Sequence, residues 1–225
     1  MPFSHQIHAV LFDVDGVLLE SLSSHLQICR DLGRDWGVPV HVPDEEGIRA
    51  MARGGTKISP QSAFFRATGF SAADAERAEA HYREHFATDY TTALYAGVRD
   101  MLARLHERGV PMGIVSANVM KNIVGPLAHS LALFDPRCVL TADAEGFNKR
   151  DAIRDVLEIW HMQPEQVIFV GDQLTDYAAA QATGVPFLGT SYGWAIAPEG
   201  NEFPVANSIA ELEAMLLDAT MLGQP

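Results

Sequence analysis

The sequence predicts an α/β protein whose core is a doubly wound parallel sheet and which carries an inserted α-helical cap-like unit. Short apolar runs that resemble buried strands alternate with single amphipathic helices along most of the chain. Between the first two runs lies a long segment with helical patterns only. Alternation of strands with single helices is typical of parallel sheets that helices cover on both faces.

Five runs of apolar and β-branched residues have the length and composition of buried strands. They are His8–Asp13, Val110–Ser116, Arg137–Thr141, Gln166–Gly171 and Val185–Leu188. Because none is long enough to be a buried helix, we expect each to be one strand of the sheet.

Helices are expected between these strands, because apolar residues recur there at helical spacing. One such face is formed by Val98, Met101, Leu102 and Leu105, and a second by Ile153, Val156, Leu157 and Trp160. Near the end of the chain, Ser208 and Glu211 have the spacing of a capping box, which predicts a last helix.

The segment from Leu22 to Leu94 interrupts the alternation, since it has no convincing buried strand. Ser71 and Asp74 indicate the start of a long helix there, and Arg53 precedes two glycines that favour a turn. We therefore expect a core domain of residues 1–20 and 95–225 and a helical cap domain of residues 21–94.

Composition excludes several classes of protein. The chain is 48% hydrophobic with a formal net charge of -13 and has no run of Lys and Arg, so we expect no nucleic-acid partner. No apolar stretch approaches the length of a membrane span, and two distant cysteines favour a reducing cytoplasm. A site for a phosphorylated compound would need its own positive charge or a metal ion.

Polar residues suited to such chemistry follow the predicted strands. Asp13, Asp15 and Gly16 come directly after the first strand, where two carboxylates can divide the roles of nucleophile and acid. Gly16 permits a sharp exit from the strand. The carboxyl ends of parallel strands are where open α/β sheets bind ligands.

Three further groups of polar residues follow the later predicted strands. Ser116 offers a hydroxyl and adjacent backbone N–H groups to phosphate oxygens, and Lys149 is one of only three lysines in this acidic chain. Asp172 and Asp176 flank the start of a helix after the fourth strand, and carboxylate oxygens suit Mg²⁺.

In chain order, DVDGVLLES, IVSAN, NKRDA and GDQLTD resemble the four signature motifs of the haloacid-dehalogenase (HAD) superfamily. The resemblance spans about Ala9 to Gly193, and the segment between the first two motifs looks like that superfamily's helical cap. The cap position, LYAGVRDMLARLHERGV and SYGW are similar to the phosphoglycolate phosphatase and β-phosphoglucomutase branch. This resemblance implies a Rossmann-like core and a cytoplasmic Mg²⁺-dependent phosphatase acting on a small phosphorylated metabolite.

The resemblance also implies roles for the four aspartates. Asp13 would attack phosphorus to form an aspartyl-phosphate, and Asp15 would protonate the leaving oxygen and then activate water. Asp13, the backbone carbonyl of Asp15 and Asp172 would hold Mg²⁺, with Asp176 in support.

The phosphoryl oxygens would be bound by Ser116, the Ala117 backbone N–H and Lys149. The third motif departs from the family pattern, because Arg150 follows Lys149 where proline is common. We expect a less rigid loop there but unchanged chemistry.

Two other functions are compatible with these motifs. A phosphomutase would share all four motifs and differ in the cap, where Arg49, Arg53, Lys57 and Gln61 are candidate substrate contacts. Of these, Lys57 is better interpreted as a surface charge. A catalytically silent binding protein would retain the fold without the activity.

Several other residues invite a functional interpretation that local structure explains better. His81 and His85 match a zinc-protease pattern, but no third ligand stands out and a solvated helix face is favoured. His25, Tyr192 and Trp194 are interpreted as packing residues.

Overall fold

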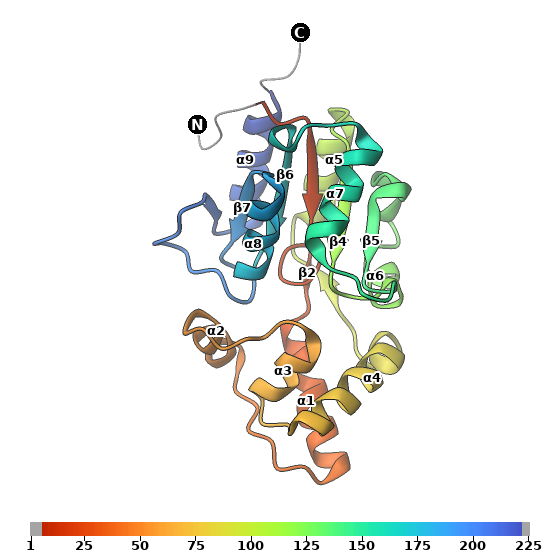
Figure 1. Ribbon diagram of the computed structural model, residues 1–225, viewed down its shortest axis with the longest axis vertical. Coiled ribbons are helices and arrows are strands. Elements are labelled where there is room, and N and C mark those ends of the chain that lie inside the picture. Colours follow the sequence, from red (N-terminus) through yellow and green to blue (C-terminus); the bar gives the residue numbers. More distant parts are fainter. Residues whose placement is uncertain (1–5, 222–225) are drawn as a thin grey trace. The chain divides into compact units, whose positions relative to one another are not determined.

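The computed structural model describes residues 6–221 of the chain (Figure 1). It divides into two compact units, one formed by the segments up to Leu19 and from Leu94 onward, and the other by Glu20–Ala93. We call them the core unit and the helical unit. Within the described residues, no helix is both long enough and apolar enough to cross a membrane.

The core unit is built on a parallel sheet with the strand order β5-β4-β1-β6-β7-β8. Its strands are β1 (Ala9–Phe12), β4 (Met112–Ser116), β5 (Val139–Thr141), β6 (Val167–Gly171), β7 (Phe187–Thr190) and β8 (Val205–Ala206). Four of the expected runs contain β1, β4, β5 and β6, and the fifth run, Val185–Leu188, overlaps β7, which extends to Thr190. The predicted α/β class with a parallel sheet is therefore confirmed.

Two details of the sheet differ from the expectation. Strand β7 begins at Phe187 rather than at Val185, because the Val185 N–H bonds to the Ala180 carbonyl and closes the end of the preceding helix. Strand β8 was not predicted. It is an edge strand of two residues, too short to leave a recognisable apolar run.

Both faces of the sheet are buried, as the apolar runs predict. In β1, Val10 and Phe12 belong to one hydrophobic cluster, whereas Ala9 and Leu11 belong to the other. This separation follows from the two-residue period of a strand.

Helices cover the sheet on both faces (Figure 1). The first cluster includes side chains from α5 (Val98–Glu107), α6 (Met120–Leu127) and α9 (Ile209–Met221). The second includes side chains from α7 (Lys149–Trp160) and α8 (Leu174–Thr183). Three short 3₁₀ turns also occur, at Leu131–Leu133, Pro136–Cys138 and Pro164–Gln166.

The start of α9 corrects the expected capping box. The Glu211 N–H donates to Ser208 Oγ at 3.2 Å, as predicted. The Glu211 carboxylate, however, accepts from the Asn207 N–H at 2.8 Å. The return bond is thus displaced by one residue, because Glu211 reaches back a full helical turn to the residue before the cap.

Strand order places a topological switch point beside β1. The chain adds β4 and β5 on one side of β1, then returns to add β6 and β7 on the other. Where the order reverses, the connections leave in opposite directions and open a crevice at the carboxyl ends of the strands. The residues after β1, β4 and β6 meet there.

The helical unit contains four helices, in keeping with the helical patterns of its sequence, although the sequence did not predict their number. They are α1 (Leu22–Trp36), α2 (Glu45–Arg53), α3 (Gln61–Ala67) and α4 (Ala72–Asp89). The start of α4 is capped as expected, since the Asp74 N–H donates to Ser71 Oγ at 3.1 Å. The short strands β2 (Leu19–Glu20) and β3 (Ala93–Leu94) pair where the chain passes between the units.

His25 is a core residue of the helical unit. Its ring is 1% exposed, with Nδ1 2.8 Å from the Ser21 carbonyl oxygen and Nε2 3.0 Å from the Tyr82 hydroxyl. The ring also lies against Phe64 and Phe86. This burial confirms the packing interpretation.

Replacing Gly113 in β4 with alanine is expected to destabilise the core unit. The added Cβ would lie 2.7 Å from Leu11 Cδ2 and 2.8 Å from the Cys138 carbonyl oxygen. Such overpacking costs about 1–3 kcal/mol, measurable by urea denaturation. Gly125→Ala is the matched control, because a Cβ added to Gly125 in α6 meets nothing within 4 Å. Equal stability of the two variants would contradict the prediction.

Candidate active site

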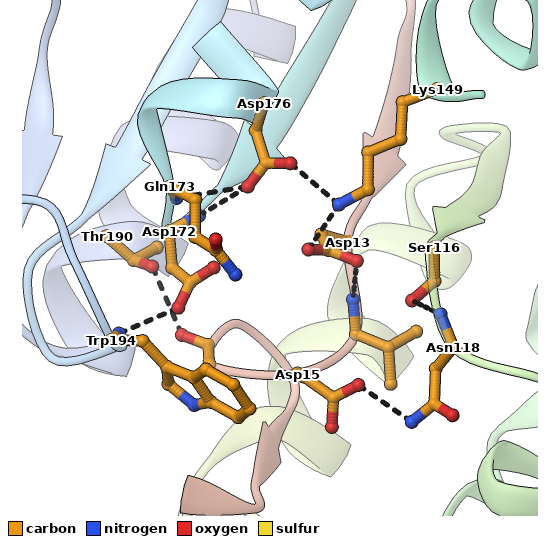
Figure 2. Close-up of polar contacts among 12 residues, drawn as sticks. Asp13, Asp15, Ser116, Asn118, Lys149, Asp172, Gln173, Asp176, Thr190 and Trp194 are labelled. Atoms are coloured by element: carbon orange, nitrogen blue, oxygen red, sulfur yellow. Dashed lines mark hydrogen bonds and ion pairs between the residues drawn. The ribbon is translucent and has the colours of Figure 1, made fainter. Parts of the chain in front are cut away.

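The residues predicted to do chemistry lie together at the carboxyl end of the sheet (Figure 2). Asp13 follows β1, Ser116 ends β4, and Asp172 follows β6. Lys149 opens α7 and Asp176 lies in the first turn of α8. The crossover topology thus brings together side chains from four separate segments of the chain.

Lys149 joins two of the carboxylates. Its Nζ lies 2.6 Å from Asp13 Oδ2 and 2.6 Å from Asp176 Oδ1, and its side chain is 14% exposed. Burial alone would lower the pKa of Lys149, but the two carboxylates outweigh it and raise that pKa. Lys149 is therefore a fixed positive charge.

Asp13, Asp172 and Asp176 form a buried carboxylate cluster. One oxygen from each lies within 4.8 Å of the others, the only such group of three or more metal-ligating side chains in residues 6–221. Burial, followed by the charges of Asp176 and Asp13, raises the pKa of Asp172 well above its ordinary value. One ammonium group does not balance three carboxylates.

The two carboxylate oxygens of Asp172 differ in their hydrogen bonding. Its Oδ2 accepts a 2.7 Å hydrogen bond from the Trp194 backbone N–H. Its Oδ1 is buried and has no hydrogen-bond partner within the described part of the chain. A buried oxygen without a donor, in a cluster with excess negative charge, is the environment that a hard cation satisfies. The residues present therefore fit a divalent metal ion such as Mg²⁺.

Asp176 differs from Asp172, because both of its oxygens are in use. Oδ1 contacts Lys149, and Oδ2 accepts from the backbone N–H groups of Asp172 at 3.2 Å and Gln173 at 3.0 Å. Burial nevertheless raises the pKa of Asp176, although Lys149 opposes the change. This geometry suits an orienting role, with Asp176 holding Lys149 and the turn after β6.

Two glycines allow backbone to approach Asp172. Gly16 has φ +74°, and a Cβ there would overlap Asp172 Oδ2. A Cβ on Gly193 would overlap Asp172 Cβ and lie 2.5 Å from the Gly16 carbonyl oxygen. Sequence reasoning assigned Gly16 to the turn after the strand, but its second function, making space for a carboxylate, is visible only in three dimensions.

The opposite side of the site is formed by the loops after β1 and β4. The Val14 N–H donates to Asp13 Oδ1 at 2.7 Å. Asp15 Oδ2 accepts from Asn118 Nδ2 at 2.8 Å, and the Asn118 N–H donates to Ser116 Oγ at 3.3 Å. Ala117, between Ser116 and Asn118, is exposed.

Sequence reasoning missed two residues of this site, Asn118 and Trp194. Asn118 lies within the quoted IVSAN motif, yet an asparagine after a strand is ordinarily part of a turn. Trp194 was interpreted as a packing residue, and its side chain is indeed buried. Its backbone N–H, however, holds Asp172, and backbone donors leave no signature in residue type.

The candidate substrate contacts of the cap lie in the helical unit. Arg49 and Arg53 of α2 form ion pairs with Glu45 at 3.0 Å and with Glu46 at 3.6 Å. Lys57 is exposed in the following loop. Their contact with substrate stays a prediction.

His81 and His85 do not form a zinc site with a third ligand in the described residues. Their rings are tilted at 33° with centroids 4.4 Å apart, but no cluster of three ligating side chains in residues 6–221 includes them. Burial, together with the charge of His85, lowers the pKa of His81. The helix-face interpretation of these two histidines stays a prediction.

Comparison with known proteins assigns the family. Residues 10–190 match the family described as haloacid dehalogenase-like hydrolase. The chain belongs to this family. The expected class of enzyme, a HAD-like phosphatase, is confirmed by its curated relatives, several of which are named as phosphatases.

Among the relatives of this HAD-family chain is a phosphoglycolate phosphatase of Chromobacterium violaceum. It is 30% identical over 223 residues, which cover 92% of this chain and 95% of the relative. An N-acetylmuramic acid 6-phosphate phosphatase of Pseudomonas putida is 27% identical over 87% of each chain. A crystal structure of a predicted phosphatase from Clostridium acetobutylicum superposes with a TM-score of 0.75 at 23% identity, covering 95% of this chain and all of that one.

The stability of this HAD-family chain without divalent cations is expected to fall as pH rises. Because the pKa of Asp172 is raised in the folded state, folding binds a proton that the unfolded chain releases near about pH 4. This contribution to stability is complete below that pH and is lost as pH rises through the folded pKa. Urea denaturation in EDTA across this range measures it.

Asp172→Asn should therefore stabilise the metal-free protein at neutral pH, by about 1–3 kcal/mol, because an amide folds without the free-energy cost of either protonating the carboxylate or burying its charge. Asp155→Asn, at an exposed position of α7, is the control and should change little. A destabilised Asp172→Asn variant would show that the buried charge is already compensated.

Proposed function

We propose that this chain is a Mg²⁺-dependent phosphatase that hydrolyses a small phosphorylated metabolite through an aspartyl-phosphate intermediate. The observation that carries the proposal is the buried cluster of Asp13, Asp172 and Asp176. Lys149 joins two of these carboxylates, and one oxygen of the cluster has no hydrogen-bond donor among residues 6–221. Such a cluster is costly to fold and is retained where it has a chemical use.

Asp13 is the best candidate for the nucleophile among the three clustered aspartates. Asp176 accepts three hydrogen bonds, from Lys149 and from two backbone N–H groups of the turn after β6, and Asp172 is completely buried. Asp13 is held from both sides, by Lys149 at Oδ2 and by the Val14 N–H at Oδ1. Opposing contacts fix the carboxylate in one orientation, which favours attack on phosphorus.

The proposed metal ligands are Asp13, the backbone carbonyl of Asp15 and Asp172, with Asp176 as a supporting residue. When bound, Mg²⁺ would neutralise the cluster and stabilise charge on the phosphoryl oxygens. Asp172 Oδ1 is suited to ligation because Trp194 orients the carboxylate through its other oxygen. Asp176 is suited to support, because it positions Lys149.

Ser116, the Ala117 N–H and Lys149 are the proposed donors to the phosphoryl group. Ser116 lies at the end of β4, beside β1 in the sheet, so its hydroxyl is on the Asn118 side of Asp13. Lys149 supplies the local positive charge that a phosphate needs in a protein of net charge -13. Donors directed at developing negative charge are the main source of catalysis in such sites.

Asp15 is the proposed acid and base. It follows Asp13 by two residues but is not part of the carboxylate cluster. Its side chain contacts the loop after β4 instead. That separation allows it to serve the leaving oxygen while Asp13 attacks phosphorus.

For the substrate class, the relatives support small phosphate monoesters with polar leaving groups. Phosphoglycolate and phosphorylated sugars are the natural first candidates. We further propose that the helical unit acts as the cap, with Arg49 and Arg53 as substrate contacts. Guanidinium groups in contact with the substrate would distinguish an anionic leaving group from a neutral one.

The test is phosphate release from phosphoglycolate and from para-nitrophenyl phosphate, with Mg²⁺ or with EDTA. The wild type should be active only with the metal, and Asp13→Asn should lose all measurable turnover while keeping its circular dichroism spectrum. Turnover by Asp13→Asn, or by the wild type in EDTA, would remove the nucleophile or the metal from the proposal.

A phosphomutase is separated from a phosphatase in the same assay. A mutase would convert a sugar phosphate to its isomer without net release of inorganic phosphate. Because several curated relatives are named as phosphatases, net phosphate release is the expected result.

Lys149→Met is expected to separate catalysis from metal binding. Loss of the ammonium should lower kcat by about 10²–10³-fold, the usual effect of removing a transition-state donor. Removal of a positive charge beside the carboxylates should leave Mg²⁺ affinity, measured by calorimetry, unchanged or tighter. Weaker Mg²⁺ binding would show that Lys149 mainly organises the cluster.

A further inference from the structure

We propose that Asn118 is a positioning residue for the general acid, because it holds the Asp15 carboxylate so that Oδ1 is the oxygen that transfers the proton. The inference rests on the proposed phosphatase and deepens it. It starts from the hydrogen bond between Asn118 Nδ2 and Asp15 Oδ2, 2.8 Å long, which joins the loop after β4 to the loop after β1 (Figure 2).

The orientation of the Asn118 amide is fixed by its other end. Its Oδ1 accepts from the Val119 backbone N–H and from Asn122 Nδ2, each at 2.8 Å. A backbone N–H can only donate, so the oxygen of Asn118 must face Val119 and the nitrogen must face Asp15. Asn118 is 6% exposed and Asn122 is 3% exposed, so little water competes for these contacts.

This orientation distinguishes the two oxygens of Asp15. The Asn118 amide nitrogen has only donors, so Asp15 Oδ2 must act as an acceptor in this contact. A proton on Asp15 is therefore directed to Oδ1. The position of the acid oxygen is thereby set by a side chain on another strand of the sheet.

Asn118 also connects the acid to the phosphate site. Its own N–H donates to Ser116 Oγ at 3.3 Å, while its side chain holds Asp15. Asn118 therefore contacts both Ser116, a proposed hydrogen-bond donor to the phosphoryl group, and Asp15, the proposed proton donor. A small displacement of Asp15 from the phosphoryl group should strongly slow a proton transfer that must accompany bond cleavage.

The step that Asn118 would assist is the first of two. Asp13 attacks phosphorus, the bond from phosphorus to the leaving oxygen breaks, and the Asp15 Oδ1 proton passes to that oxygen. The products are the free alcohol, an aspartyl-phosphate on Asp13 and an ionised Asp15. In the second step water attacks phosphorus, Asp15 takes the water proton, and inorganic phosphate and the Asp13 carboxylate are released.

The leaving group separates a positioning role from a structural one. The value of kcat/KM reports the steps from free enzyme and substrate up to loss of the leaving group. Hydrolysis of the phosphoenzyme comes later and is the same for every substrate. Phenolate from phenyl phosphate needs a proton, whereas dinitrophenolate is stable without one. A misplaced acid should therefore slow only the first substrate, while a damaged site should slow both.

The experiment measures kcat/KM for phenyl phosphate and dinitrophenyl phosphate with saturating Mg²⁺. Asn118→Ala should lower the value for phenyl phosphate by about 10- to 100-fold and that for dinitrophenyl phosphate by less than about threefold. Asn118→Asp is the second variant. It keeps an acceptor for Val119 and Asn122 but has no donor for Asp15, so it should show the same selective loss.

Asn201→Ala is the control, because Asn201 Nδ2 also donates hydrogen bonds, to the Ala197 carbonyl at 2.8 Å and to the Glu199 carbonyl at 3.4 Å, but contacts none of the proposed catalytic residues through them. It should leave both substrates unaffected. Equal losses on both substrates, or none on either, with a folded Asn118 variant would overturn the positioning role. A wild type that releases no phosphate from either ester would instead refute the proposed phosphatase and this role with it.

Discussion

The site depends on one electrostatic constraint, the burial of three carboxylates beside a single ammonium group. Asp13, Asp172 and Asp176 have oxygens within 4.8 Å of one another, and Lys149 bridges two of them. Low dielectric surroundings strengthen both the repulsion and the attraction. Backbone N–H groups satisfy part of the charge, at Asp176 and, through Trp194, at Asp172. The remaining negative charge is what makes the cluster suited to a cation and, with it, to a phosphate.

The parallel sheet holds these charged residues close together, because each follows or begins a rigid apolar strand or helix. Strand β1 lies between β4 and β6, so the residues that follow these three strands converge without long loops. The net charge of -13 would repel phosphorylated compounds from the surface at large. Local positive charge at the crevice is consequently decisive for the proposed substrate class.

Most of the fold could be predicted, because burial on both faces produces apolar runs that are distinct from helical periodicity. The helices around Val98 and Ile153 follow their apolar spacing, and β1, β4 and β6 follow their runs. The details that escaped prediction are those that tertiary contacts decide. Val185 looks like strand but completes a helix end, and β8 exists only as a partner for β7.

From the sequence alone came the order and chemistry of the charged residues, together with the strands that carry them, since residue type and apolar pattern are local properties. The tertiary structure decided which oxygen meets which donor. Only there does Trp194 reach Asp172 and Asn118 reach Asp15, across 22 and 103 residues of chain. Those contacts depend on backbone N–H groups and on the direction of an amide, and neither is written in the identity of a residue.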